Sequence, residues 1–337
     1  MKIYHHDRPF QLEMGGELPE LTIAYHTFGE MNADKSNVVW VCHALTANSD
    51  VTDWWPHTVE KDRFLDPAKY FIICANILGS CYGTTGPLHT NPATGKPYYR
   101  DFPTCTIRDI VRAHQVLADA LGIDRIHTIL GSSVGGFQCL EWAVMQPDRI
   151  ERLVLVSTDA KASPWVIAIN ETQRMAIISD ATYYDDVPEG GSKGLAAARA
   201  IGLLSYRASS GYNLTQQDAP DATLATPHRA CTYQRYQGEK LVKRFDAYSY
   251  TSITLSFDSQ DVGRGRGGIA KALSTIKAKT LLLAFTTDIL FPVEDMRRLT
   301  GMIPGAELCL IESPFGHDGF LVEADKLNSI LKPFICE

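Results

Sequence analysis

The chain has 337 residues, 45% of them hydrophobic, and carries a formal net charge of -7 with a pI of about 5.8. This length allows one large core with a sizeable insertion, or two domains. A mildly acidic chain gives no indication of binding to nucleic acid or to an anionic membrane.

Short apolar runs alternate with helical periodicity and predict a mostly parallel sheet flanked by helices on both faces. In chain order, buried strands are expected over residues 38–42, 71–75, 126–130, 153–157, 280–285 and 307–311. Amphipathic helices are expected over residues 107–121 and 134–145. The sequence therefore predicts the α/β class.

The alternation of strands and helices stops after Ser157 and resumes at Thr280. The intervening chain shows helical periodicity over residues 165–178, 194–206 and 241–256, with polar or glycine-rich linkers. We therefore expect a core domain of residues 1–162 and 277–337, interrupted by a helical lid insertion of residues 163–276.

A glycine-rich turn, Gly131-Ser132-Ser133-Val134-Gly135, lies between an expected strand and an expected helix. A G-x-S-x-G turn in this position is the nucleophile elbow of α/β hydrolases, in which a strained serine is exposed at the end of a strand. The start of the following helix favours a developing negative charge. We predict an α/β-hydrolase fold with Ser133 as the nucleophile, although an incidental serine in a glycine-rich turn is the alternative.

A serine nucleophile needs a base and an orienting acid, which in this fold follow it in the order acid, histidine. His317 lies in the loop after the strand of residues 307–311 and is the expected base, whereas His228 lies in a polar stretch typical of a surface. Asp288 ends the preceding strand and is the expected acid. Asp295 is the second choice, and capping of the next helix is the structural alternative for Asp288.

An oxyanion hole requires two backbone N–H donors. One is expected from Val134, directly after the nucleophile, and the other from Leu45, in the loop after the first buried strand. His43, in the same loop, precedes the elbow and is interpreted as a structural histidine.

The lid offers groups that suit an amino-acid substrate. Arg199 and Tyr206 are seven residues apart, share a helix face and could bind a carboxylate together. Asp318, beside the expected base, could pair with an ammonium group. Ordinary surface charges remain the alternative for Arg199 and Asp318.

Motifs spread over most of the chain form a recognisable set. They lie at residues 24–25, 43–46, 76–87, 101–103, 106–109, 235–238, 244–247, 261–267, 288–292 and 316–318. With this set, the chain resembles the homoserine O-acetyltransferase family of the α/β-hydrolase superfamily. Two neighbours of the nucleophile, Ser132 and Val134, depart from the glycine and methionine usual there, and residues 178–192 are shorter than usual and lack a tryptophan.

The resemblance implies a ping-pong reaction that serves methionine biosynthesis. Ser133 would take the acetyl group from acetyl-CoA, a co-substrate, and pass it to the hydroxyl of L-homoserine. Arg199 and Tyr206 would bind the homoserine carboxylate and Asp318 its amino group. The resemblance also implies a homodimer formed through lid helices, with no permanently bound cofactor and no metal.

Three other functions remain open at this point. The first is transfer of a succinyl group to homoserine, or of an acyl group to serine, by the same machinery. The second is a lidded esterase, and the third is a non-catalytic receptor of the same fold.

The N-terminus lacks the apolar core of a signal peptide, and no apolar run is long enough to span a membrane. Because the eight cysteines include no C-x-x-C pair, free thiols and a cytoplasmic location are expected.

Overall fold

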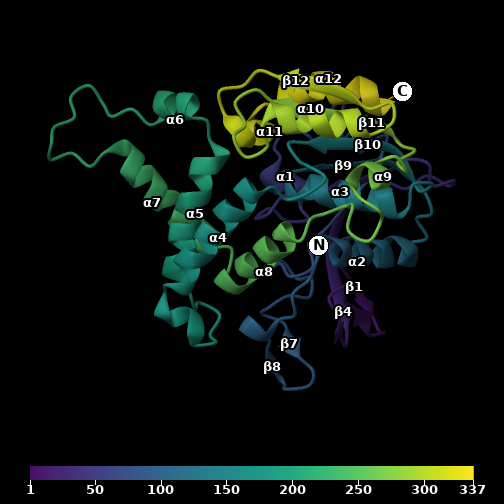
Figure 1. Ribbon diagram of the computed structural model, residues 1–337, viewed down its shortest axis with the longest axis horizontal. Helices are drawn as coiled ribbons and strands as arrows, with labels where there is room; N and C mark the ends of the chain where they lie inside the picture. Colours follow the sequence, from purple (N-terminus) through teal and green to yellow (C-terminus); the bar gives the residue numbers. More distant parts are fainter. Residues whose placement is uncertain (337) are drawn as a thin grey trace.

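The computed structural model describes residues 1–336, which contain one eight-stranded sheet in the order β1-β4-β6-β5-β9-β10-β11-β12 (Figure 1). From β6 to β12, neighbouring strands are parallel, whereas β4 runs antiparallel to β1 and to β6. The strands are β1 Lys2–His6, β4 Leu21–Phe28, β5 Val38–Cys42, β6 Phe71–Ala75, β9 Ile126–Ser132, β10 Ile150–Val156, β11 Lys279–Phe285 and β12 Glu307–Ile311.

All six predicted strands are present, three of them with the predicted bounds. The prediction missed β1 and β4, which add antiparallel pairs at one edge of the sheet. The strand β1 is largely exposed and contains no apolar run, so its sequence shows none of the burial that marks the central strands. Two short antiparallel pairs, β2 Phe10–Gln11 with β3 Glu17–Leu18 and β7 Thr90–Asn91 with β8 Lys96–Pro97, lie outside the main sheet.

Side chains alternate between the two faces of the sheet and form a core on each side. On β5, Val39 and Val41 belong to the core that also contains Leu327 of α12, whereas Trp40 belongs to the core that contains Phe137 of α3. Since every residue of β5 is buried, the strand reads as a continuous apolar run. The core helices are α1 Val51–Trp54, α2 Ile107–Ala120, α3 Val134–Met145, α9 Ile269–Leu273, α10 Val293–Met302, α11 Gly319–Val322 and α12 Ala324–Cys336.

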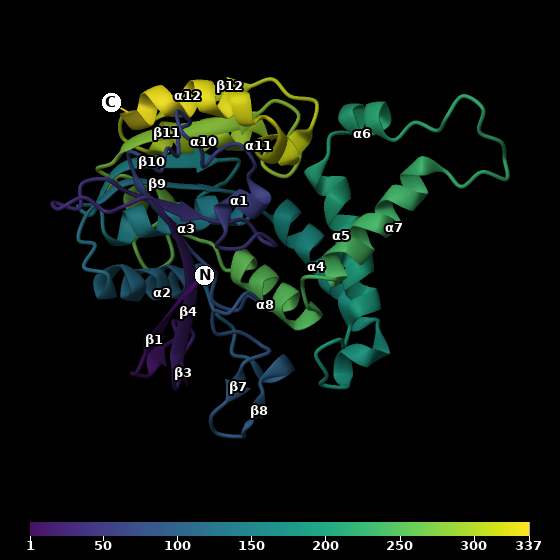
Figure 2. The ribbon, with the colours of Figure 1, turned by 180° about the vertical axis from the view of Figure 1, so that it is seen from behind.

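A group of helices between β10 and β11 stands beside the core, shown in teal and green in Figures 1 and 2. Within it α4 packs on α5 and α8, and α5 packs on α7. The long connection between α6 and α7 projects away from the rest of the molecule (Figure 1). The helices are α4 Pro164–Ile178, α5 Ser192–Tyr206, α6 Ser209–Thr215, α7 Arg229–Val242 and α8 Ala247–Asp258.

The single helix predicted over residues 241–256 is wrong. α7 ends at Val242, and α8 begins at Ala247 after a break. Asp246 is the N-cap of α8, and its carboxylate accepts a hydrogen bond from the Ser249 N–H at 2.7 Å. The carboxylate satisfies a backbone donor that a new helix leaves free, so the chain starts a second helix there.

The helices of residues 1–336 include none with the length and apolar character needed to cross a membrane. The eight cysteines form no disulfide.

Candidate active site

Ser133 lies in the turn between β9 and α3 with φ 57° and ψ -124°, which is a strained conformation for a residue with a side chain. The prediction of a strained serine is confirmed. The Ser133 N–H donates to the Val156 carbonyl at 3.0 Å, and the Thr158 hydroxyl donates to the Ser133 carbonyl at 2.9 Å. These bonds to the end of β10 and to the segment that follows it hold the serine in its unfavourable geometry.

Gly135 follows the nucleophile by two residues and lies against β5. A Cβ atom at this position would collide with the carbonyl oxygen of Cys42. A residue with a side chain would therefore push α3 away from the end of β5, from which the loop bearing Leu45 departs. The glycine is required here by a close approach of two backbones.

The His317 side chain is held by Asp288 in a buried pair. Their Nδ1 and Oδ2 atoms are 2.8 Å apart, and His317 is only 3% exposed. The other Asp288 oxygen, Oδ1, accepts the N–H groups of Leu290 and Phe291 at 2.8 and 3.0 Å. These bonds keep Asp288 pointed at the imidazole, so Nδ1 carries the proton and Nε2 is left as the basic atom.

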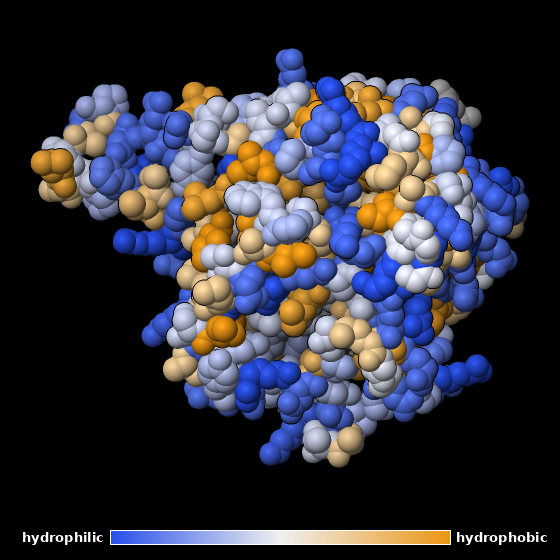
Figure 3. Space-filling view, viewed as in Figure 1, coloured by the Kyte–Doolittle hydropathy of each residue, from blue (hydrophilic) through white to orange (hydrophobic). Residues whose placement is uncertain are grey.

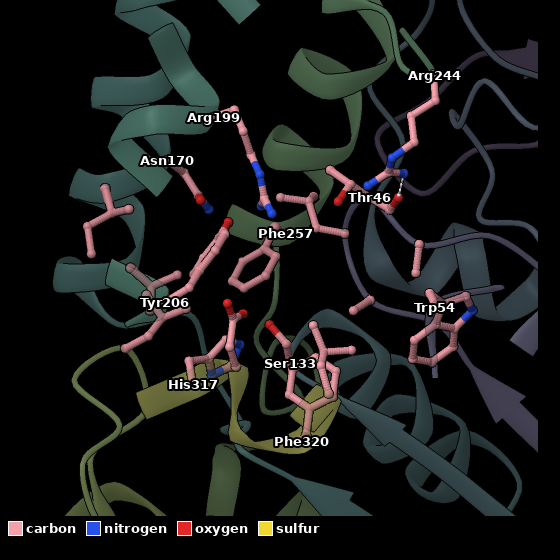
Figure 4. A pocket seen from close by; sticks show the side chains of 18 residues that line it. Thr46, Trp54, Ser133, Asn170, Arg199, Tyr206, Arg244, Phe257, His317 and Phe320 are labelled. Atoms are coloured by element: carbon pink, nitrogen blue, oxygen red, sulfur yellow. Dashed lines mark hydrogen bonds between the residues drawn. The ribbon is translucent and has the colours of Figure 1, made fainter. Parts of the chain in front are cut away.

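Ser133 and His317 line one cavity of about 130 Å³ between the sheet and the lid (Figure 4). Figure 4 shows the two side chains next to each other at its base, although no hydrogen bond joins the Ser133 hydroxyl to His317. Such bonds are often long before substrate binds. Arg244 and Leu290, from the motifs at residues 244–247 and 288–292, also line the cavity. Further lining residues that were not predicted are Trp54, Val166, Ile169, Asn170, Phe257 and Phe320.

The backbone N–H groups of Leu45 and Val134 have no acceptor within residues 1–336. Both residues are buried, and Leu45 lines the cavity. An unpaired buried donor directly after the serine and a second one from a residue that lines the cavity are the groups that an oxyanion requires. Their role as an oxyanion hole stays a prediction.

The His43 side chain helps to hold the loop that carries Leu45. Its Nδ1 donates to the Ala44 carbonyl at 2.9 Å, and its Nε2 accepts the Ile77 N–H at 3.0 Å. Burial lowers the pKa of His43 to about 4, so it is neutral at pH 7. With both ring nitrogens engaged, His43 is the structural histidine that the sequence predicts.

Arg199 and Tyr206 meet on α5, with the Arg199 guanidinium 5.7 Å from the centre of the Tyr206 ring. The predicted shared face is confirmed. Both side chains line the cavity, where Figure 4 shows Arg199 pointing from the lid toward the side that holds Ser133. Within the described part of the chain, no carboxylate pairs with Arg199. Burial raises the pKa of Tyr206, and the nearby Arg199 charge partly offsets this effect.

Asp318 lines the same cavity, but it already has a partner. The Arg207 guanidinium, one residue after α5, contacts its Oδ2 at 2.5 Å. Sequence reasoning missed Arg207, because an arginine 111 residues away from Asp318 gives no local signal. The ion pair with Arg207 occupies Oδ2 and leaves the Oδ1 atom of this buried carboxylate for a further contact.

Asp295, the second choice for the acid, and His228, the expected surface histidine, both lie away from the site. Asp295 is bound by Arg298 through an ion pair at 2.6 Å, and Arg298 also pairs with Asp159. His228 is exposed and contacts Asp218 at 2.7 Å. Neither residue lines the cavity that contains Ser133.

Known proteins resemble this chain in both sequence and fold. The α/β hydrolase fold family matches residues 37–324. A homoserine O-acetyltransferase of Cyclobacterium marinum is 46% identical over 100% of this chain and 95% of its own length. A crystal structure of homoserine O-acetyltransferase from Bacillus anthracis matches with a TM-score of 0.92 and 23% identity, covering 100% of this chain and 97% of that one. An acetylester hydrolase from Corynebacterium glutamicum matches with a TM-score of 0.88 and 24% identity, covering 100% and 96%.

Proposed function

This chain belongs to the homoserine O-acetyltransferase family of α/β-hydrolase enzymes, and we propose that it moves an acetyl group from acetyl-CoA to the hydroxyl of L-homoserine. The chain is thus an acyltransferase with the predicted fold. The donor, the acyl-enzyme and a place in methionine biosynthesis are parts of the proposal.

In the first half-reaction, Ser133 attacks the thioester carbonyl while His317 Nε2 takes the hydroxyl proton. Asp288 stabilises the resulting imidazolium through its bond to Nδ1. The N–H groups of Leu45 and Val134 bind the oxyanion. The carbon–sulfur bond then breaks, His317 returns the proton to the sulfur, CoA leaves as the thiol, and Ser133 carries the acetyl ester.

In the second half-reaction, the homoserine hydroxyl replaces CoA. His317 accepts its proton as the oxygen attacks the acetyl ester, and then returns that proton to Ser133 as the ester bond breaks. Arg199, with Tyr206, binds the substrate carboxylate, and Asp318 binds its ammonium group. These groups orient the hydroxyl toward the acyl carbon and favour it over water.

One observation carries the proposal: a single cavity holds both the reacting pair and charges that match an amino acid. Ser133 and His317 lie on one side of it, and Arg199 and Asp318 provide a cation and an anion. A simple ester needs neither charge. We therefore favour transfer to an amino acid over hydrolysis.

The test measures CoA release from acetyl-CoA and from succinyl-CoA, each with homoserine, with serine and with water alone. We expect rapid release only from acetyl-CoA with homoserine. Equal release in water would contradict transfer, and a preference for succinyl-CoA or serine would contradict the donor or acceptor.

A matched pair of variants tests the acceptor site. Arg199→Met should raise the KM for homoserine by about 10- to 100-fold, because one charged hydrogen bond is lost, while acetylation of Ser133 stays normal. Lys193→Met removes an exposed charge from the same helix and should leave both steps unchanged. An unchanged KM in Arg199→Met would contradict the assigned role.

Hydrolysis of acetyl esters is the second candidate function. It is favoured by the likeness to an acetylester hydrolase of known structure, since the same acyl-enzyme can react with water. Release of acetate at the same rate with and without homoserine would select it.

We also propose that the protein is a homodimer located in the cytoplasm. Figure 3 shows apolar side chains in orange over the lid helices, and Trp165, Met175, Ile178, Leu204 and Tyr236 are exposed there. Such an apolar surface is typical of a protein–protein interface. Light scattering after gel filtration should give twice the 37.3 kDa mass, and a monomer would contradict this part.

A further inference from the structure

The loop of residues 43–47, which carries the Leu45 N–H, is held at two places. At its start, His43 ties the loop to Ile77 and to its own Ala44 carbonyl. At its end, the Thr46 carbonyl accepts a hydrogen bond from Arg244 Nη1, which the dashed line in Figure 4 marks. The second tie comes from the connection between α7 and α8, and so from the lid.

Arg244 is itself fixed by residues that follow β6. Its Nη1 also contacts the Tyr82 hydroxyl at 2.7 Å, and the Cys81 thiol lies 3.6 Å from the Arg244 carbonyl oxygen. The Tyr82 ring packs edge-on against Phe245, with 5.6 Å between ring centres. Two motifs that have no part in the proposed chemistry, residues 76–87 and 244–247, therefore meet at the Leu45 loop.

The partners of Arg244 are neutral oxygens. Within residues 1–336 it forms no ion pair with a carboxylate, although it lines the cavity that contains Ser133. A guanidinium bound to a peptide carbonyl fixes the direction of that carbonyl. The Leu45 N–H shares a peptide unit with the Ala44 carbonyl, which His43 Nδ1 holds at 2.9 Å, and the Thr46 carbonyl held by Arg244 lies two peptide units further along. The two bonds together limit rotation of the backbone between them, so loss of the Arg244 bond lets the Leu45 N–H turn on one side.

We propose that Arg244 is a positioning residue, which aims the Leu45 N–H at the oxyanion by holding the Thr46 carbonyl from the lid. The inference rests on the proposed function, in which that N–H stabilises the acylation transition state. Because Arg244 lies between α7 and α8, its bond to Thr46 also makes the rate of acylation depend on the position of the lid relative to the core.

The test uses a donor that contains no CoA. The value of kcat/KM for p-nitrophenyl acetate reports acylation of Ser133 and does not depend on recognition of a nucleotide. It is compared with kcat/KM for acetyl-CoA in the full-length protein and in three variants, Arg244→Met, Arg244→Lys and Lys243→Met. Lys243 is exposed and adjacent, and its replacement matches the change in charge. Thermal unfolding of each variant is measured in parallel.

We expect Arg244→Met to lower kcat/KM about 10-fold or more for both donors, since misdirecting one oxyanion donor removes part of its effect. Arg244→Lys can still donate to Thr46 and should recover much of the rate, and Lys243→Met should match the unmodified protein.

Two outcomes would overturn the inference. Loss of activity toward acetyl-CoA alone would make Arg244 a donor-binding residue. Normal rates for both donors with a lowered Tm would make it only structural. Failure of the proposed function is distinguishable, because the unmodified protein would then release CoA from acetyl-CoA no faster with homoserine than with water alone.

Discussion

At the residue scale, the most constrained side chain in the site is Asp288. One of its oxygens accepts two backbone N–H groups, and the other contacts His317 Nδ1. An asparagine at this position can keep the backbone bonds through its oxygen, but it presents an NH₂ group to the imidazole. The imidazole then has to place its proton on Nε2, where the serine proton should go.

Asp288→Asn should therefore lower kcat for acetyl transfer by as much as about 10⁴-fold, the effect of the wrong histidine tautomer in serine proteases, with little change in Tm. Steady-state kinetics and thermal unfolding check this prediction. Asp295→Asn is the control, because Asp295 contacts Arg298 outside the cavity and its replacement should leave kcat unchanged. If Asp295→Asn lowered kcat and Asp288→Asn did not, the assignment of Asp288 as the acid that orients His317 would be wrong.

At the element scale, the break between α7 and α8 has the largest consequence, because it places Arg244 next to the Leu45 loop. A continuous helix over residues 241–256 would carry this arginine along a helix face instead. The break depends on Asp246, which is largely buried and accepts the Ser249 N–H at 2.7 Å.

Asp246→Ala should lower the free energy of unfolding by about 1 kcal/mol, the usual cost of a lost N-cap. Urea unfolding measures this change. Asp246→Asn keeps an oxygen that can accept the same bond and should recover most of the stability. If the alanine and asparagine variants were equally unstable, the charge rather than the cap would be the important feature.

At the scale of the whole molecule, buried histidines connect stability to pH. Burial lowers the pKa of His43 and of His114 from 6.5 to about 4. Between these values the unfolded chain binds protons that the folded chain does not, so acidification favours unfolding. Asp159 acts in the opposite direction, because burial raises its pKa to about 6 and the folded chain then holds a proton that the unfolded chain releases.

Burial lowers the pKa of His127 to about 4 as well. The free energy of unfolding should consequently decrease as the pH falls from 6.5 toward 4, since these three histidines outweigh Asp159. His114→Gln should reduce this dependence by up to about 1.4 kcal/mol per pH unit, and Asp159→Asn should steepen it. Urea titrations between pH 4 and 7 provide the measurement. Stability that rises on acidification would contradict the assignment of neutral buried histidines.

Much of the fold could be predicted because central strands of a parallel sheet are buried on both faces and appear as uninterrupted apolar runs. β5 and β6 are buried throughout and have the predicted bounds for this reason, whereas the exposed edge strand β1 was not predicted. The nucleophile elbow could also be predicted, because its glycines stand close together in the sequence. Gly135 is one of them, and it lets the backbone of α3 approach the end of β5. The chain order of Ser133, Asp288 and His317 then follows from the topology of the sheet.

The sequence by itself determined the α/β class, the elbow and the pair of Asp288 and His317, because each depends on local periodicity or on a strand end. Only the tertiary structure decided that Arg207 pairs with Asp318 and that Arg244 holds Thr46, a residue 198 positions away. Those contacts depend on where the lid docks, and the docking is set by packing of whole helices rather than by any local pattern. The nucleophilic serine can therefore be predicted from the sequence, whereas the lid residues around it can be assigned only from the folded structure.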